Sequence, residues 1–230
     1  MQRKKNLFYA IFFSILAVIF TILTKNIDVK PIGPESSAVG FATWNLAVHQ
    51  GFGFNETLYK ITEILGYLLF GFVLVYAILG LAQLVKRKSF FKVDRGIICF
   101  GALILAMLAV YVLFDKLALN FRPVILDGEL EPSYPSSHTL FALCIAGGVI
   151  LLNKGTFANS KFAKIISIAA MFLASFTVVG RMLSGVHWIT DILGGILISA
   201  ALVSIYNLFL TPVKSDKIKN KHWHFRQSVV

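Results

Sequence analysis

The sequence is poor in charged residues and in cysteine. Only 14% of its 230 residues are Asp, Glu, Lys or Arg, whereas an ordinary soluble domain carries about 25%. Since 57% of the residues are hydrophobic and the mean hydropathy is +0.77, the composition excludes a disordered chain and argues strongly against a water-soluble protein. The two cysteines, Cys99 and Cys144, lie in apolar runs. They offer neither a disulfide framework nor metal-binding spacing, so we interpret them as packing residues.

Acidic residues are scarce relative to basic ones, at 11 against 22, which gives a net charge of +11. In a soluble protein this excess would indicate a nucleic-acid partner. In so apolar a chain it is more typical of one face of a membrane, and we expect no nucleic-acid partner.

Six runs approach or exceed the length of about 20 predominantly apolar residues that a transmembrane helix needs. The first run follows three basic residues, as in a signal peptide, but it is long for one and lacks a small-residue cleavage site, so we interpret it as a retained helix. The second run is interrupted near its start by Glu63. We predict an all-α fold, a polytopic membrane bundle with six transmembrane helices. The predicted spans are Leu7–Leu23, Ile61–Val85, Gly96–Phe114, Ser136–Asn153, Ile165–Gly180 and Ile192–Val213.

The loop charges indicate an orientation. Six spans place both termini on one side, where 16 basic and two acidic residues give +14, while the other side carries −3. Because cytoplasmic loops carry the excess of Lys and Arg, we expect cytoplasmic termini, in a bacterial plasma membrane. We interpret the basic segment 214–226, with His222, Trp223 and His224, as a solvated tail that touches anionic lipid.

The predicted outward loops are Thr24–Lys60, Asp115–Pro135 and Arg181–His187. In the first, the apolar stretch 39–54 is either a short helix in the lipid interface or a loop packed over the bundle. In the second, the acidic segment Asp127–Glu131 either gates the site or is solvated surface. No repeat, low-complexity segment or linker divides the chain, so we expect a single integral-membrane domain over residues 1–230.

Most polar side chains that would be costly within apolar helices gather around the second and third outward loops. Ionisable residues at the ends of membrane helices need partners and are candidates for a functional site. We therefore expect an active site at the outer membrane face, within residues 115–191. The candidates are Asp115, Lys116, Arg122, Ser136, Ser137, His138, Arg181, His187 and Asp191.

Two histidines of this group suit phosphoryl transfer. His187 and Asp191 are four residues apart at the predicted start of the last helix, so they share a face, and the carboxylate can orient the imidazole as a nucleophile. His138 follows another predicted helix start, where free N–H groups and the helix dipole favour an anion. Arg122 and Arg181 add planar donors that suit phosphate oxygens. One histidine to attack, one to protonate a leaving group and several cations are typical of a phosphoryl-transfer site.

Three motifs in this order resemble those of the type 2 phosphatidic acid phosphatase family, which includes bacterial membrane lipid phosphatases and shares its site with vanadium haloperoxidases. They lie within residues 115–191, and the six-helix layout extends the resemblance to the whole chain. The motifs are Lys116 with Arg122-Pro123, then Pro135-Ser136-Ser137-His138, then Arg181 with His187 and Asp191.

The resemblance implies a role for each motif residue. His187 would attack phosphorus and carry a transient phosphohistidine, Asp191 would orient it, and His138 would protonate the leaving group. Family members of this kind need no metal and no cofactor, and the sequence has no cluster of three carboxylate or histidine ligands at metal spacing. The phosphoryl oxygens would be held by Lys116, Arg122, Ser136, Arg181 and the backbone of Ser137.

Three positions depart from the family pattern. Five residues separate Lys116 from Arg122 where the family has six, so Asp115 occupies the expected position. Since one residue is about 100° of helix rotation, Lys116 reaches the phosphate only if the backbone after it is irregular. The usual glycine of the second motif is Ser137, and the usual serine before the third-motif arginine is Gly180.

We predict an enzyme that hydrolyses the terminal phosphate of a lipid phosphate or diphosphate, with its tail between the helices. Undecaprenyl diphosphate, phosphatidylglycerophosphate and phosphatidic acid all fit, and an outward site favours undecaprenyl diphosphate, a carrier lipid recycled after use outside. The alternative is a non-enzymatic protein that binds or transports an anionic lipid, which needs neither His187 nor Asp191; no broken-helix repeat indicates a transporter. We expect membrane lipids as partners and no obligate protein partner.

Overall fold

The computed structural model describes residues 2–211, which form seven α-helices and two short 3-10 turns, η1 (Pro34–Ser36) and η2 (Phe90–Lys92). Strand pairing in this range is limited to isolated bridges. Six of the helices are long and apolar enough to cross a membrane, which confirms the predicted all-α bundle with six spans. The α-helices are α1 (Gln2–Asn26), α2 (Ala42–Phe52), α3 (Glu56–Arg87), α4 (Arg95–Leu117), α5 (Ser137–Thr156), α6 (Lys161–Leu183) and α7 (Ile189–Leu210).

The helix ends differ from the predicted runs by a few residues. Most spans extend into polar flanking residues; α3, for example, begins after Asn55, whose side chain accepts a hydrogen bond from Leu58 N at 3.0 Å. Helix α7 ends at Leu210 rather than at the predicted Val213, because Thr211 precedes a proline and the residue before proline disfavours the helical conformation. The predicted basic tail lies outside the described residues.

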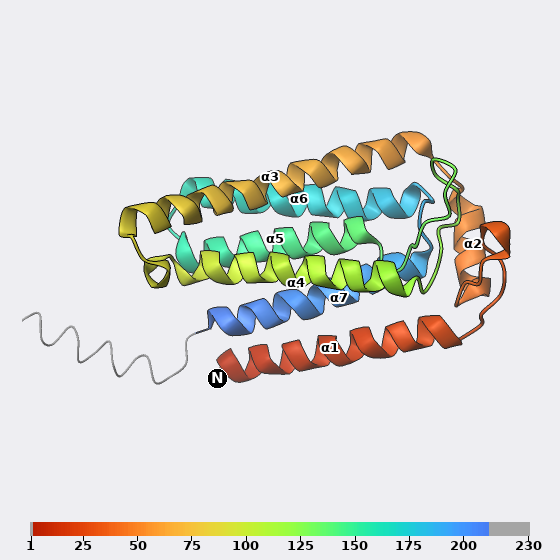
Figure 1. Ribbon diagram of the computed structural model, residues 1–230, viewed down its shortest axis with the longest axis horizontal. Coiled ribbons are helices and arrows are strands. Elements are labelled where there is room, and N and C mark those ends of the chain that lie inside the picture. The colour runs from red at the N-terminus through yellow and green to blue at the C-terminus, as the bar shows by residue number, and fades with distance from the viewer. Residues whose placement is uncertain (1, 212–230) are drawn as a thin grey trace, which may run out of the picture.

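Helix α5 lies at the centre of the bundle, where it packs against α3, α4, α6 and α7, and α1 packs along α7 (Figure 1). Small residues permit these close contacts. A Cβ atom on Gly148 would come within 2.6 Å of Phe100 on α4, and one on Gly147 within 3.0 Å of Val203 on α7. Many large apolar side chains of α1, α3 and α6 are exposed instead, as expected of helices whose outer faces meet lipid.

The two ends of the bundle differ. Helix α1 starts and helix α7 finishes at the same end, which also carries the α3–α4 and α5–α6 connections, and α2 lies across the opposite end (Figure 1). The three predicted outward loops therefore meet at one end of the molecule.

Residues 42–52 form a helix, α2, and not the alternative loop; its place in the lipid interface stays a prediction. A buried hydrogen bond joins it to the start of α7, where Asn45 Nδ2 donates to Thr190 Oγ1 at 2.9 Å. The same amide group donates to the carbonyl of Gly40, just before α2, at 2.7 Å. Trp44 is exposed on its outer side.

Candidate active site

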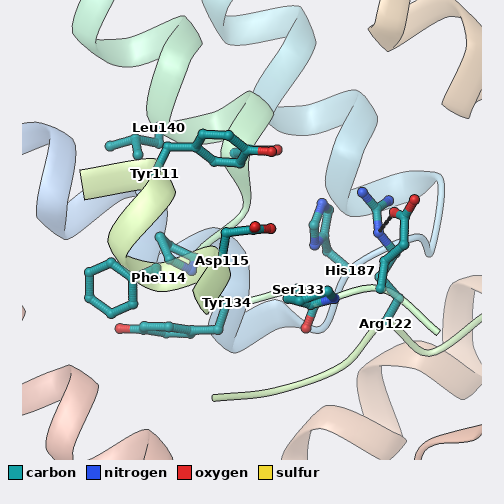
Figure 2. A pocket seen from close by; sticks show the side chains of 12 residues that line it. Tyr111, Phe114, Asp115, Arg122, Ser133, Tyr134, Leu140 and His187 are labelled. Atoms are coloured by element: carbon teal, nitrogen blue, oxygen red, sulfur yellow. Dashed lines mark ion pairs between the residues drawn. The ribbon is translucent and has the colours of Figure 1, made fainter. Parts of the chain in front are cut away.

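A cavity of about 190 Å³ lies at the end of the bundle where the predicted outward loops meet. The last turns of α4, the connection from α4 to α5 and the loop before α7 form its wall, and Figure 2 shows Asp115, Arg122 and His187 around it. Ser137, the first residue of α5, also lines it. The cavity thus has one lining residue from each motif: Arg122, Ser137 and His187. His138 does not line it but lines a neighbouring cavity with Glu63, and neither Arg181 nor Asp191 is in its lining.

His187 and Asp191 are both buried, and His187 Nδ1 lies 3.5 Å from Asp191 Oδ2. The prediction that both belong to the last helix is wrong for His187, because Trp188 caps α7 and the helix begins at Ile189. Asp191 Oδ2 accepts a hydrogen bond from Trp188 N at 3.0 Å, which starts the helix there. Its other oxygen accepts one from Asn120 Nδ2 at 3.2 Å. The carboxylate is thus held by the cap and faces the imidazole at ion-pair distance.

The environment of His187 favours a neutral imidazole. Burial lowers its pKa well below the usual value, and the positive charges of Arg122 and Arg181 lower the pKa further. The ring therefore stays neutral at neutral pH and gains a proton only under more acidic conditions. The neutral form is the one that a nitrogen nucleophile requires.

The start of α5 lies at the cavity, where Ser137 is part of the lining. Ser136 caps the helix: its Oγ accepts a hydrogen bond from Thr139 N at 3.4 Å, and its own N–H donates to the Asp191 carbonyl at 3.0 Å. By helix geometry, the N–H groups of Ser137 and His138 have no carbonyl partner within the helix. Ser136 therefore holds α5 against α7, and its side chain does not line the cavity.

The two arginines of the motifs are each paired with a carboxylate. Arg122 Nε lies 2.8 Å from Glu131 Oε2, so one end of the acidic segment 127–131 contacts the site. Arg181 is completely buried, and its Nη2 donates to Glu63 Oε1 at 2.6 Å. The same Glu63 oxygen lies 3.2 Å from His138 Nε2.

Lys116 does not line the cavity, and Asp115 does. Helix α4 remains regular through Leu117 and becomes irregular only at Ala118, whose φ is 43°. The backbone therefore does not make the turn that would bring Lys116 to the phosphate position, and the predicted phosphate contact of Lys116 is not supported by this arrangement.

Sequence reasoning missed two partners of the site. Glu63 appeared only as an interruption of an apolar run, although a lone carboxylate within a membrane span is itself a signal for a functional site. Asn120, which binds Asp191, lies between the first-motif residues in a loop whose side chains no pattern singles out.

Within residues 2–211, no group of three or more His, Cys, Asp and Glu side chains is arranged to hold a metal ion. The positive charges of the site are those of Arg122 and Arg181, which pair with the carboxylates of Glu131 and Glu63.

The fold and the site together define a multi-pass membrane protein with a cavity at one end of a helical bundle, lined by Arg122, His187 and the start of α5. The model of the PAP2 superfamily matches residues 97–213, which is 117 of the 230 residues, and the chain belongs to this superfamily. The match includes all three motifs.

Two relatives agree with this assignment. Phosphatidylglycerophosphatase B of Bacillus subtilis (strain 168) is 30% identical over 114 residues, which are 49% of this chain and 51% of the relative, so the chain matches about half of that protein's length. The crystal structure of a transmembrane PAP2 type phosphatidylglycerolphosphate phosphatase from Bacillus subtilis covers 89% of this chain and 95% of its own, with a TM-score of 0.56 and 21% identity. This likeness shows that the two chains share a fold.

Proposed function

We propose that this protein is an integral-membrane lipid phosphatase that acts through a phosphohistidine. The observation that carries the proposal is the buried, neutral His187, which lines the cavity with Arg122 and Ser137. Its Nδ1 faces Asp191, and the charge of Arg181 acts on the same imidazole. Binding of an anionic lipid needs the arginines alone, whereas a neutral imidazole oriented by a carboxylate serves a nucleophile.

The proposed reaction has two steps. Since Nδ1 of His187 faces Asp191, Nε2 attacks phosphorus; a P–N bond forms and the P–O bond to the lipid breaks, while His138 gives its proton to the departing oxygen. A water molecule then attacks phosphorus, His138 takes back a proton, and phosphate leaves His187. The charge that develops on the phosphoryl oxygens would be stabilised by Arg122, Arg181 and the N–H group of Ser137.

The substrate we place first is phosphatidylglycerophosphate, because the names of both relatives specify a phosphatase of that lipid. This changes the order of the predicted substrates, in which undecaprenyl diphosphate came first; undecaprenyl diphosphate and phosphatidic acid remain the competing substrates. Initial rates of phosphate release from the three lipids, presented side by side in the same detergent, rank them.

The test of the enzyme is phosphate release by the purified protein with a chelator present. We expect activity in wild type and a loss of at least about 10³-fold in His187→Ala, as for removal of other nucleophiles. The matched control is His49→Ala, since His49 lies on α2 and does not line the cavity; it should keep most of the activity. Unchanged hydrolysis after His187→Ala would favour the non-enzymatic lipid-binding alternative.

We also propose that the chain forms a single integral-membrane domain with both termini in the cytoplasm and its site facing outward. Packing of the first described helix along the last supports one domain, and the charge difference between the two loop sets supports the orientation. Membrane lipids are its proposed partners, without an obligate protein partner.

A further inference from the structure

Glu63 contacts two residues to which the proposed mechanism gives a role, Arg181 and His138. Its Oε1 accepts a hydrogen bond from Arg181 Nη2 at 2.6 Å and lies 3.2 Å from His138 Nε2. One carboxylate oxygen therefore contacts a guanidinium and an imidazole, the two groups to which the proposed mechanism assigns the substrate's phosphate and its leaving oxygen.

Close packing of α3 puts this carboxylate in place. A Cβ atom on Gly180 would collide with the methyl group of Thr62, the neighbour of Glu63. One turn further along α3, a Cβ atom on Gly66 would come within 3.1 Å of His138 Cδ2. Glycines on both sides of the contact thus let α3 approach α6 and α5. This gives a physical reason for Gly180 at a position where the family usually has serine.

Arg181 depends on Glu63 for its charge partner. The guanidinium is completely buried, its carbon atom lies 4.9 Å from the centre of the Tyr59 ring, and its Nε and Nη1 have no hydrogen-bond partner among residues 2–211. A buried cation without an anion is strongly unfavourable. Two free donors beside one occupied donor suit an anion with several oxygens, such as phosphate.

The carboxylate has room to leave. Glu63 does not line the cavity of His187. It lines another cavity, of about 690 Å³, with Tyr59, Lys60 and the loop 125–127. This space lies next to the carboxylate and is wide enough to receive it after a change of side-chain rotamer.

We propose that Glu63 is an internal anion that holds Arg181 and His138 until a lipid phosphate binds, and that the phosphate then displaces it from both. The proposal rests on the proposed function. Because a carboxylate only accepts hydrogen bonds, the resting contact keeps the proton of His138 on Nε2. Displacement frees this N–H group for the leaving oxygen. The donor is the imidazolium form of His138, which passes its Nε2 proton to that oxygen and is left as a neutral imidazole.

Orthovanadate and inorganic phosphate are the probes, used as inhibitors of the purified full-length protein. In Glu63→Gln we expect the inhibition constant for orthovanadate to fall about tenfold, which corresponds to about 1.4 kcal/mol of lost competition. In Glu63→Asp the charge remains but the carboxylate is one methylene shorter, so a smaller decrease is expected. Tighter binding of orthovanadate by the Asp variant therefore shows that the carboxylate of residue 63 occupies the anion position, because the charge itself is unchanged.

The matched control is Glu56→Gln, which removes the same charge from the exposed first turn of α3, where Glu56 pairs with Lys60 at 2.7 Å; its inhibition constants should equal those of wild type. If Glu63→Gln does not fold, Glu63→Asp alone decides, since it retains an anion near Arg181. Inhibition constants in the folded variants that equal or exceed the wild-type value overturn the proposal.

The failure of this inference is distinguishable from that of the proposed function. A wild-type protein that neither hydrolyses lipid phosphates nor is stabilised against heat by orthovanadate overturns both. An active, vanadate-sensitive wild type with unchanged Glu63 variants overturns the internal anion alone.

Discussion

At the residue scale, single side chains set the charge of the cavity. Asp115 lines it at the position where the family pattern has a lysine, and Glu131 pairs with Arg122 at its edge. Together with Glu63, these carboxylates offset the two arginines. The site is therefore less positive than its motifs alone suggest, and in the proposed function phosphate would compete with these carboxylates.

Replacing Asp115 with Asn removes a like charge from the path of the phosphate. Because Asp115 is exposed to solvent and its field is screened, we expect a modest effect, a decrease of about two- to fivefold in KM for a lipid phosphate with little change in kcat. Initial rates over a range of substrate concentrations measure both. The same charge change in the loop between α4 and α5, Asp127→Asn, should leave KM unaltered; a higher KM in Asp115→Asn would contradict this account of the cavity.

The sequence predicted which residues are candidates for the site better than it predicted their contacts. His138, Arg181, His187 and Asp191 stood out because such side chains are costly at the ends of apolar helices unless they have partners. The sequence did not show whether Asp115 or Lys116 lines the cavity, because that depends on whether α4 stays regular to its last residue.

At the element scale, glycines decide how closely helices and loops approach. Gly185 follows α6 with φ at 64°, a left-handed conformation, and a Cβ atom there would collide with the carbonyl oxygen of Gly53. In the same turn, the carbonyl oxygen of Ser184 accepts a hydrogen bond from Asn55 N at 2.9 Å. This turn therefore docks the end of α6 on the start of α3, which aligns Arg181 with Glu63.

Gly185→Ala should destabilise the protein. The left-handed backbone alone costs an alanine about 1–2 kcal/mol, and the collision adds to it, so we expect the melting temperature to fall by roughly 4–8 °C for about 2 kcal/mol. Thermal unfolding in detergent measures this. The control is Gly51→Ala, because Gly51 lies within α2 with nothing near its missing Cβ; there the melting temperature should stay constant or rise. An unchanged melting temperature in Gly185→Ala would falsify the role of this turn.

At the scale of the whole molecule, the proposed orientation separates two sets of connections. The α3–α4 turn would face the cytoplasm and the loop between α4 and α5 would face outward (Figure 1). Both ends are therefore accessible to water but on opposite sides of the membrane.

Cysteine labelling in intact cells tests this orientation. In a variant with Cys99 and Cys144 replaced by alanine, Asp127→Cys should react with a membrane-impermeant maleimide, and Lys88→Cys should react only after the membrane is permeabilised. The opposite pattern would place the site on the cytoplasmic side and remove the argument for a lipid that is processed outside.

The sequence by itself determined the number of spans, their apolar character and the residue types that gather at one end. These follow from hydropathy and from the cost of burying charge, which are properties of short segments. Only the tertiary structure decided which partner each charged side chain takes. Arg181 and Glu63 lie 118 residues apart in the chain, and they meet because small residues let α3 and α6 pack closely. No local pattern encodes that contact, since it depends on the relative rotation and depth of two helices.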